Sequence, residues 1–288
     1  MRTTPFILSI SMTPKPTADL TVLDSVLAEL AQQSFSLRVQ RDSLTGGAVL
    51  FSAGEEELDT AFDRIWRACN REVVFGRPEV IYLETISAAA EAEGRYIRQA
   101  GGTGNYGHCW LRVEPNARGE GYEFHNRTAG GVIPRQFIDA INQGVREAMR
   151  GGVLGGHEMV DVKVTLFDGS VHDTDSNEMA FQIAASMAFK EAARKAMPVL
   201  LEPVMEIEVI IPEEYMGKVI QDLRFRRGRI DGIDALDETQ SLRATVPMAT
   251  MFGYAPNLRA STQGHASYKV RFKQYEVCAE DQGPGFRV

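Results

Sequence analysis

The chain has 288 residues, of which 44% are hydrophobic and 24% charged, and its formal net charge at pH 7 is −8. This composition predicts two or three folded domains, and the acidic balance excludes a protein that grips nucleic acid over its whole surface. The three cysteines form no CxxC pair and no stretch approaches ~18 consecutive apolar residues, so we expect a cytoplasmic protein with neither a disulfide framework nor a membrane span.

The first segment has the order βαββαβ. Apolar periodicity predicts strands at residues 7–12, 35–41, 48–52 and 72–75 and helices at residues 19–33 and 55–68. This order is that of a ferredoxin-like module, which we place at residues 1–79.

The middle segment, residues 80–203, is predicted to be a single mixed α+β domain. Strands are expected near residues 80–87, 96–99, 108–114 and 123–127, followed by a helix that Pro134 opens and two Gly-Gly pairs end. A strand at residues 159–167, a polar loop at 168–175 and a long helix at 176–197 complete the domain.

The long helix should be packed over about three quarters of its surface, because only Gln182, Ser186, Lys190 and Arg194 form a polar stripe while Met179 and Met187 join the apolar remainder. Asp175 is expected to cap it, with Glu178 completing a capping box. The loop before the helix is then held by a rigid element, which suits a contact residue. An ordinary solvated loop explains the same spacing.

The last segment, residues 204–288, repeats the βαββαβ order. Strands are predicted at residues 205–211, 229–234, 241–246 and 268–273, with helices after Pro212 and at residues 248–258. The predicted fold class is therefore α+β, with two ferredoxin-like modules flanking a mixed domain.

A literal GxGxxG occurs in the middle segment, but it leads into an expected strand rather than a helix, which excludes a dinucleotide fingerprint. We interpret it as a hairpin tip whose bare backbone can press against RNA phosphate and sugar. The motif consists of Gly102, Thr103, Gly104, Asn105, Tyr106 and Gly107, and Gly101 directly precedes it.

Enzyme chemistry finds little support. His108 and Cys109 are neighbours in an expected strand and so point to opposite faces, which argues against a cysteine hydrolase with Glu114 as its acid. The five histidines lack ligand spacing, so we expect no metal. Because no GxxxxGK[ST] is present, these residues should not hydrolyse GTP and should need no cofactor of their own.

A basic run follows the helix after Pro212. Arg224, Arg226 and Arg227, with Arg229 beyond them, are either a solvated helix end or a local phosphate contact in an otherwise acidic chain.

The chain resembles the C-terminal half of bacterial translation elongation factor G, essentially from Phe6 to Glu276, and several specific blocks in the right order carry the resemblance. They are Gly130-Gly131-Val132-Ile133-Pro134, Arg146-Glu147-Ala148-Met149, Val160-Asp161-Val162-Lys163-Val164-Thr165-Leu166, Ser176-Asn177-Glu178-Met179-Ala180-Phe181, Met251-Phe252-Gly253-Tyr254, Leu258-Arg259 and Thr262-Gln263-Gly264.

The resemblance implies that the two modules are the family's third and fifth domains, and that the middle is its fourth domain, whose fold is shared with a small-subunit ribosomal protein. In the family, tip loops of the fourth domain touch the messenger–transfer RNA duplex in the decoding site during translocation. These loops align with residues 101–107 and 171–176. The contact residues implied in the second loop are His172, Asp173, Thr174 and Asp175.

By the same resemblance the fifth domain contacts ribosomal RNA, a role that suits Arg224, Arg226 and Arg227. The implied partners are the ribosome, with the messenger–transfer RNA duplex at its decoding site, and, where a separate chain supplies the GTPase domain, that chain, which would bring GTP and Mg²⁺. Two departures are the sequence Gly54-Glu55-Glu56-Glu57-Leu58, where the family has Gly-Glu-Leu-His-Leu, and Thr103, where it often has Arg. A ribosome-protection factor of the tetracycline-resistance type is a related alternative.

Overall fold

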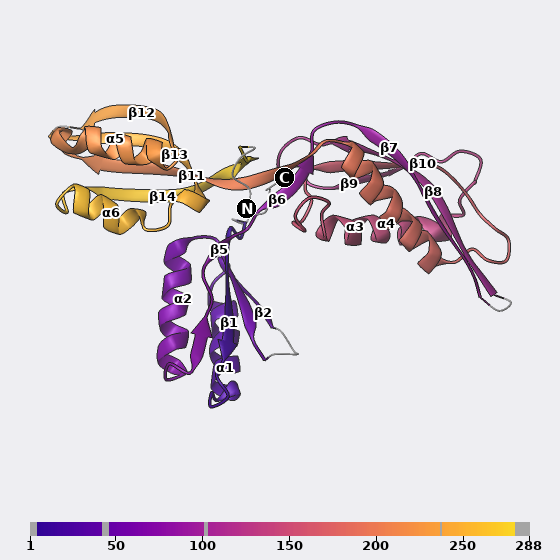
Figure 1. Cartoon of the computed structure of the whole chain (residues 1–288), viewed down its shortest axis with the longest axis horizontal. Helices are drawn as coiled ribbons and strands as arrows, with labels where there is room; N and C mark the ends of the chain where they lie inside the picture. Colours follow the sequence, from indigo (N-terminus) through magenta and orange to yellow (C-terminus); the bar gives the residue numbers. More distant parts are fainter. Residues whose placement is uncertain (1–4, 42–45, 101–102, 237, 280–288) are drawn as a thin grey trace. The chain divides into compact units, whose positions relative to one another are not determined.

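The computed structural model describes residues 5–41, 46–100, 103–236 and 238–279 (Figure 1). The chain divides into two compact units. The first unit comprises Met1–Ile81 and Glu202–Glu276, and the second comprises Tyr82–Leu201 and Val277–Val288. Each unit has its own sheets and helices, which confirms the predicted α+β class.

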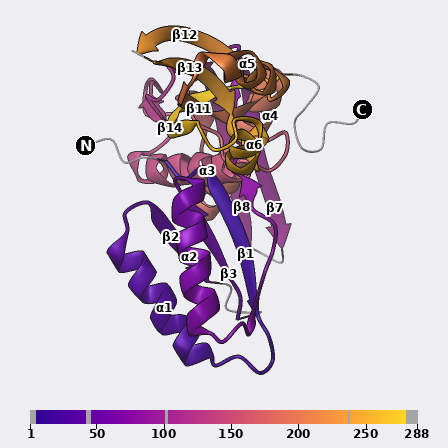
Figure 2. The ribbon, with the colours of Figure 1, turned by 90° about the vertical axis from the view of Figure 1, so that its left-hand side faces the viewer.

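The N-terminal module of the first unit has the predicted βαββαβ order. Its elements are β1 (Leu8–Pro14), α1 (Leu20–Gln33), β2 (Leu37–Arg41), β3 (Ala48–Ser52), α2 (Glu55–Ala68) and β4 (Val73–Phe75), and the short β5 (Glu79–Val80) also pairs with β1. The strands are in the order β2-β3-β1-β4. Figure 2 shows α1 and α2 side by side along this sheet. The apolar face of each helix is buried, including Leu23, Leu27 and Ile65.

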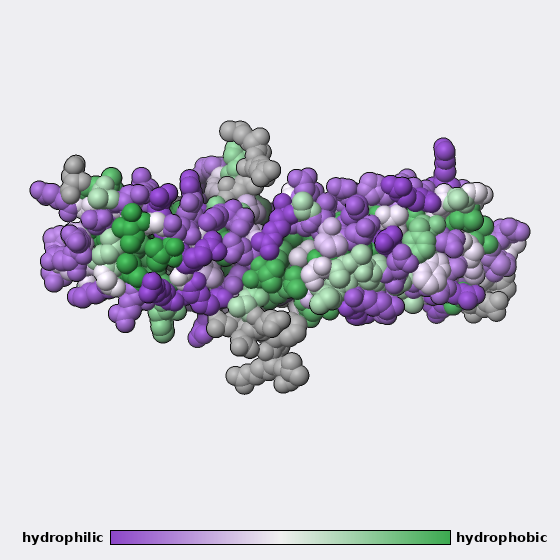
Figure 3. Space-filling view, turned by 90° about the horizontal axis from the view of Figure 1, so that it is seen from above, coloured by the Kyte–Doolittle hydropathy of each residue, from purple (hydrophilic) through white to green (hydrophobic). Residues whose placement is uncertain are grey.

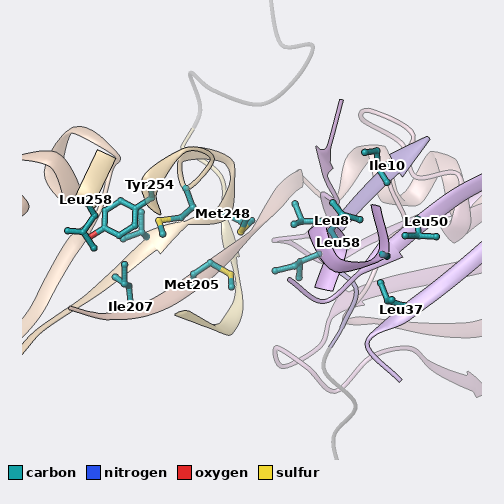
Figure 4. Packing of buried hydrophobic residues seen from close by; sticks show 14 of the residues in the cluster. Leu8, Ile10, Leu37, Leu50, Leu58, Met205, Ile207, Met248, Tyr254 and Leu258 are labelled. Carbon is teal, nitrogen blue, oxygen red and sulfur yellow. The ribbon is translucent and has the colours of Figure 1, made fainter. Parts of the chain in front are cut away.

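The second module of the first unit repeats this arrangement. Its elements are β11 (Pro198–Ile211), α5 (Met216–Phe225), β12 (Arg229–Leu236), β13 (Thr239–Pro247), α6 (Tyr254–Ser261) and β14 (Ser267–Val277), in the strand order β12-β13-β11-β14. The last helix begins later than predicted, because Gly253 has φ 72° and separates the 3₁₀ turn η3 (Met248–Thr250) from α6. Figure 4 labels part of the buried cores, including Leu8 and Leu50 of the first module and Ile207 and Tyr254 of the second.

The second unit is a four-stranded sheet covered by two helices. Its elements are β6 (Leu83–Ile86), β7 (Ala90–Ala100), β8 (Thr103–Pro115), β9 (Glu123–Asn126), η1 (Arg135–Phe137), α3 (Ile138–Arg150), β10 (Val162–Ser170) and α4 (Glu178–Lys195). The strand order is β7-β8-β10-β9, with β9 parallel to β10 and the other pairs antiparallel. Strand β7 is longer than predicted, because pairing with β8 from Ala90 onward overrides the local alanine-rich sequence.

Glycines let α4 lie directly on the sheet backbone. A Cβ at Gly94 of β7 would overlap the carbonyl oxygen of Ala184, and one at Gly107 of β8 would overlap that of Ala180. The alanines of α4 that face the sheet are fully buried. The close approach of helix and strand therefore explains two glycines of this sheet without any ligand.

The outer face of α4 differs from the prediction. Met179 is 54% exposed and Met187 is 48% exposed, whereas both were expected to be packed. The sheet covers one side of the helix and α3 covers a second, and the third side remains open in the described part of the chain. The face of the protein in Figure 3 mixes hydrophilic residues with smaller hydrophobic areas. Among the described residues, no helix is long and apolar enough to span a membrane.

Candidate nucleic-acid interface

The loop between β10 and α4 meets the end of the β7–β8 hairpin. The hairpin is paired up to Ala100 and Thr103, and the predicted contact residues Gly101 and Gly102 lie outside the described residues. We call residues 103–106 and 171–177 the tip. Gly104, Asn105 and Tyr106 belong to strand β8 rather than to a loop, which corrects the interpretation of the whole GxGxxG as a hairpin turn.

Hydrogen bonds hold the two parts of the tip together. The backbone N–H of Tyr106 donates to the carbonyl oxygen of Asp175 at 2.7 Å, and Asn177 Nδ2 donates to Asn105 Oδ1 at 2.8 Å. Gly104 faces the Asp175 carboxylate so closely that a Cβ there would overlap it. The structure thus brings together the residues of both predicted loops that it describes.

His172 contributes an exposed imidazole to the tip. Its backbone N–H donates to Ser176 Oγ at 2.9 Å, and its carbonyl oxygen accepts from the Ser176 N–H at 3.2 Å, so the loop is closed on itself. Its Nδ1 lies 3.3 Å from Thr174 Oγ1 and 3.4 Å from Asp175 Oδ2, and the side chain is 53% exposed. The imidazole is therefore oriented by its own loop and remains accessible, as are Asp173 and Thr174.

The cap of α4 is Asn177, not Asp175. Asn177 Oδ1 accepts the N–H of Ala180 at 2.9 Å, and the helix begins at Glu178. Asp175 is two residues before that cap, and its carboxylate and carbonyl groups are turned toward Gly104, His172 and Tyr106 instead. The prediction failed because either residue satisfies the local capping pattern, and only the pairing with β8 separates them.

A polar cluster supports the tip from the sheet, and the sequence did not reveal it. Ser170 Oγ lies 2.7 Å from the Tyr106 hydroxyl and 2.6 Å from His108 Nδ1, while His108 Nε2 lies 2.9 Å from Glu93 Oε1. The rings of Tyr106 and His172 are 5.9 Å apart. The cluster depends on the register that pairs Ser170 with His108, which no short-range pattern indicates.

Cys109 cannot serve as a nucleophile here. His108 points to the partly exposed face of β8, whereas the Cys109 side chain is fully buried on the opposite face. Burial raises the pKa of its thiol to about 12, so the reactive thiolate is scarce near neutral pH. These two observations argue against Cys109 as the nucleophile of a hydrolase. In the described residues no group of three or more His, Cys, Asp or Glu side chains could hold a metal ion.

The arginine run at the end of α5 is mostly structural, which corrects the expectation for Arg226 and Arg227. Arg226 is nearly buried, donating from Nε to Asp222 at 3.0 Å and from Nη1 to the Thr250 carbonyl at 2.5 Å. Arg227 makes a bidentate ion pair with the buried Glu202, from Nη1 to Oε1 at 2.9 Å and from Nη2 to Oε2 at 2.7 Å. Of the three predicted contacts only Arg224 is exposed.

Three models of elongation factor G domains match the chain. Elongation factor G domain III matches residues 4–77, domain IV matches residues 78–197, and the elongation factor G C-terminus matches residues 199–283. The fold is similar to the crystal structure of a protein from Thermus thermophilus, with a TM-score of 0.74, and the two sequences are 39% identical over the match. That match covers 95% of this chain and 41% of the Thermus chain.

The fold and these matches together define domains of a translation elongation factor. More specifically, the chain belongs to the elongation factor G family, of which it carries domains III and IV and the C-terminal domain. It spans about two fifths of the length of the solved structure that it matches.

Proposed function

We propose that this chain is the ribosome-binding part of a bacterial elongation factor G, and that its tip enters the decoding site while tRNA and mRNA are moved. The observation that carries the proposal is the self-closed loop of residues 172–176, which is braced on Tyr106 and presents an oriented, half-exposed His172. A rigid element with short polar side chains suits contact with the 2′-hydroxyls and sugar edges of paired RNA strands.

The proposed ribosomal contact of the C-terminal domain rests on Arg224 alone among the three predicted arginines, because the other two are held by carboxylates. GTP hydrolysis would be supplied by a GTPase domain with its own Mg²⁺, in the same protein or in a separate chain. The present residues contain no GxxxxGK[ST] and are proposed to act by binding and positioning rather than by chemistry.

The test compares His172→Ala with Asn177→Ala. His172→Ala should change the free energy of unfolding by less than about 0.5 kcal/mol, because the side chain is exposed. It should slow movement of mRNA by about tenfold, which corresponds to about 1.4 kcal/mol of lost RNA contact. Asn177→Ala should instead cost about 1 kcal/mol of stability through the lost cap.

Movement of mRNA is measured by toeprinting on bacterial ribosomes, with the chain joined to a GTPase half of an elongation factor G. Stability is measured by urea unfolding of the chain alone. Asn177→Ala also removes the bond to Asn105 within the tip, so it is the reference for lost stability and not for unchanged movement of mRNA. If His172→Ala melts the second unit while movement per folded molecule is unchanged, the loop is structural and the proposed role of the tip is wrong.

A further inference from the structure

A third loop reaches the same end of the second unit as the tip. It follows β9 and ends on the first residue of η1, and we call residues 127–135 the arginine loop. Strand β9 pairs parallel with β10, from Glu123 opposite Lys163 to Asn126 opposite Leu166. The C-terminal ends of both strands therefore point toward the same end of the sheet. Figure 1 shows the connections after β9 and β10 at the end of the sheet where the β7–β8 hairpin also ends.

The arginine loop is fixed to the sheet beside the tip. The backbone N–H of Arg127 donates to the carbonyl oxygen of Leu166 at 2.8 Å, and that of Thr128 donates to Asn126 Oδ1 at 3.0 Å. At the other end of the loop, the buried side chain of Ile133 lies where a Cβ on Gly169 would be. Gly169 immediately precedes Ser170, whose hydroxyl is hydrogen-bonded to Tyr106. The arginine loop and the tip therefore both contact the last residues of β10.

The groups that this loop exposes are cationic. Arg127 and Arg135 are both exposed, and in the described part of the chain neither guanidinium has an ion-pair partner. Between them, Gly130 and Gly131 have φ of 64° and 71°, and a Cβ at either would meet no atom within 4 Å. The turn therefore offers a bare backbone with open space in front of it.

The tip itself lacks such groups. Residues 171–177 carry two aspartates, Asp173 and Asp175, and neither lysine nor arginine. An acidic loop repels RNA phosphates, so an RNA strand at this end of the unit needs cations from elsewhere. The arginine loop is anchored at the same end of the unit and supplies two cationic side chains.

We propose that Arg127 and Arg135 hold the sugar–phosphate backbone of an RNA strand against the bare turn of residues 129–132. Guanidinium groups suit the geometry of phosphate oxygens, and a glycine backbone allows close approach of the strand. This inference rests on the proposed function, since it assigns the phosphate contact that accompanies the reading of RNA shape by the tip. An RNA strand is favoured over an acidic protein because the adjoining loop exposes the polar side chains of His172, Asp173 and Thr174.

The test is the salt dependence of binding. The dissociation constant of the complete chain for mRNA-programmed bacterial ribosomes is measured over a series of KCl concentrations, for Arg127→Gln, Arg135→Gln and the double variant. Each single variant should reduce the slope of log Kd against log salt by about 0.7, as expected for one phosphate contact on a single strand. The double variant should lose about twice that amount.

Two further variants give the control. Arg194→Gln removes the same charge from an exposed position near the opposite end of α4, and its slope should equal that of the unaltered chain. Arg127→Lys should keep most of the slope, because a lysine retains the point charge on phosphate. All variants should keep the melting temperature, since both arginines of the loop are exposed.

Equal slopes for the double variant and for Arg194→Gln, with ribosome binding intact, would overturn the phosphate contact and leave the proposed function standing. Photo-crosslinks from a probe at Ala129→Cys should join RNA. Crosslinks to ribosomal protein alone would identify an acidic protein as the occupant and overturn the inference. Failure of the unaltered chain to bind ribosomes at any salt would refute the proposed function and this contact together.

Discussion

Gly94→Ala is expected to lower the free energy of unfolding of the second unit by about 3 kcal/mol, at the upper end of what overpacking costs. The added methyl group would overlap the Ala184 carbonyl oxygen and lie 2.8 Å from the backbone nitrogen of Ala188. Both atoms belong to the backbone of α4 and cannot rotate away. The whole helix must therefore lift from the sheet, with loss of contacts along β7 and β8.

The two tryptophans make this measurement specific to one unit. Trp110 is on β8, and its ring centroid lies 6.1 Å from that of Phe167. Trp66 is on α2 of the first unit. In a Trp66→Phe background, urea unfolding followed by fluorescence reports Trp110 alone. The control is Gly151→Ala, whose Cβ would have Ala148 as its nearest neighbour at 3.8 Å and should change stability by less than about 0.5 kcal/mol. Equal effects of the two substitutions would contradict the direct packing of α4 on the sheet.

Glu84→Gln is expected to cost a similar amount, about 3 kcal/mol or more, because it leaves buried donors without acceptors. Glu84 is fully buried, and its carboxylate accepts hydrogen bonds from four backbone N–H groups of the loop after α3. Its Oε2 accepts from Val153 at 2.6 Å and Leu154 at 3.0 Å, and its Oε1 accepts from Gly155 at 2.8 Å and His157 at 3.1 Å.

The substitution isolates hydrogen bonding from packing, because glutamine has nearly the same volume as glutamate. Its amide NH₂ would face two N–H groups, which places donor against donor. The matched control is Glu158→Gln, which removes the same charge from an exposed side chain of the loop that Glu84 binds and should stay within about 0.5 kcal/mol. Both are measured by Trp110 fluorescence in urea. A Glu84→Gln protein as stable as Glu158→Gln would show that the four bonds contribute little.

The sequence predicted the two ferredoxin-like modules well because their strands and helices are amphipathic and locally signalled. Leu23, Leu27 and Leu30 follow the helical period, and the alternation of β1 follows the period of a strand. The same reasoning predicted a loop before α4, but placed it at residues 168–175, whereas β10 continues to Ser170 and α4 begins only at Glu178.

Features set by contacts between distant segments were not predictable in this way. The exposure of Met179 depends on which sides of α4 the sheet and α3 cover, and the burial of Arg226 depends on Asp222 together with carbonyl groups of the η3 turn and its C-terminal flank. The cluster of Ser170, His108 and Tyr106 requires a specific antiparallel register. The place of the arginine loop follows from the parallel pairing of β9, which no turn signal in the sequence specifies.

The proposed role of the tip is tested most directly with a cleavage reagent that is attached to the tip and cuts the RNA near it. Asp173→Cys places an accessible thiol in the loop, and the three native cysteines are buried, so an Fe–EDTA reagent should attach selectively. Hydroxyl radicals released from residue 173 on programmed ribosomes should cut mRNA and small-subunit RNA of the decoding site. The same reagent at Met187→Cys, on the open face of α4, should cut these positions more weakly. Equal cleavage from both positions, or cleavage of large-subunit RNA alone, with binding intact, would contradict the account.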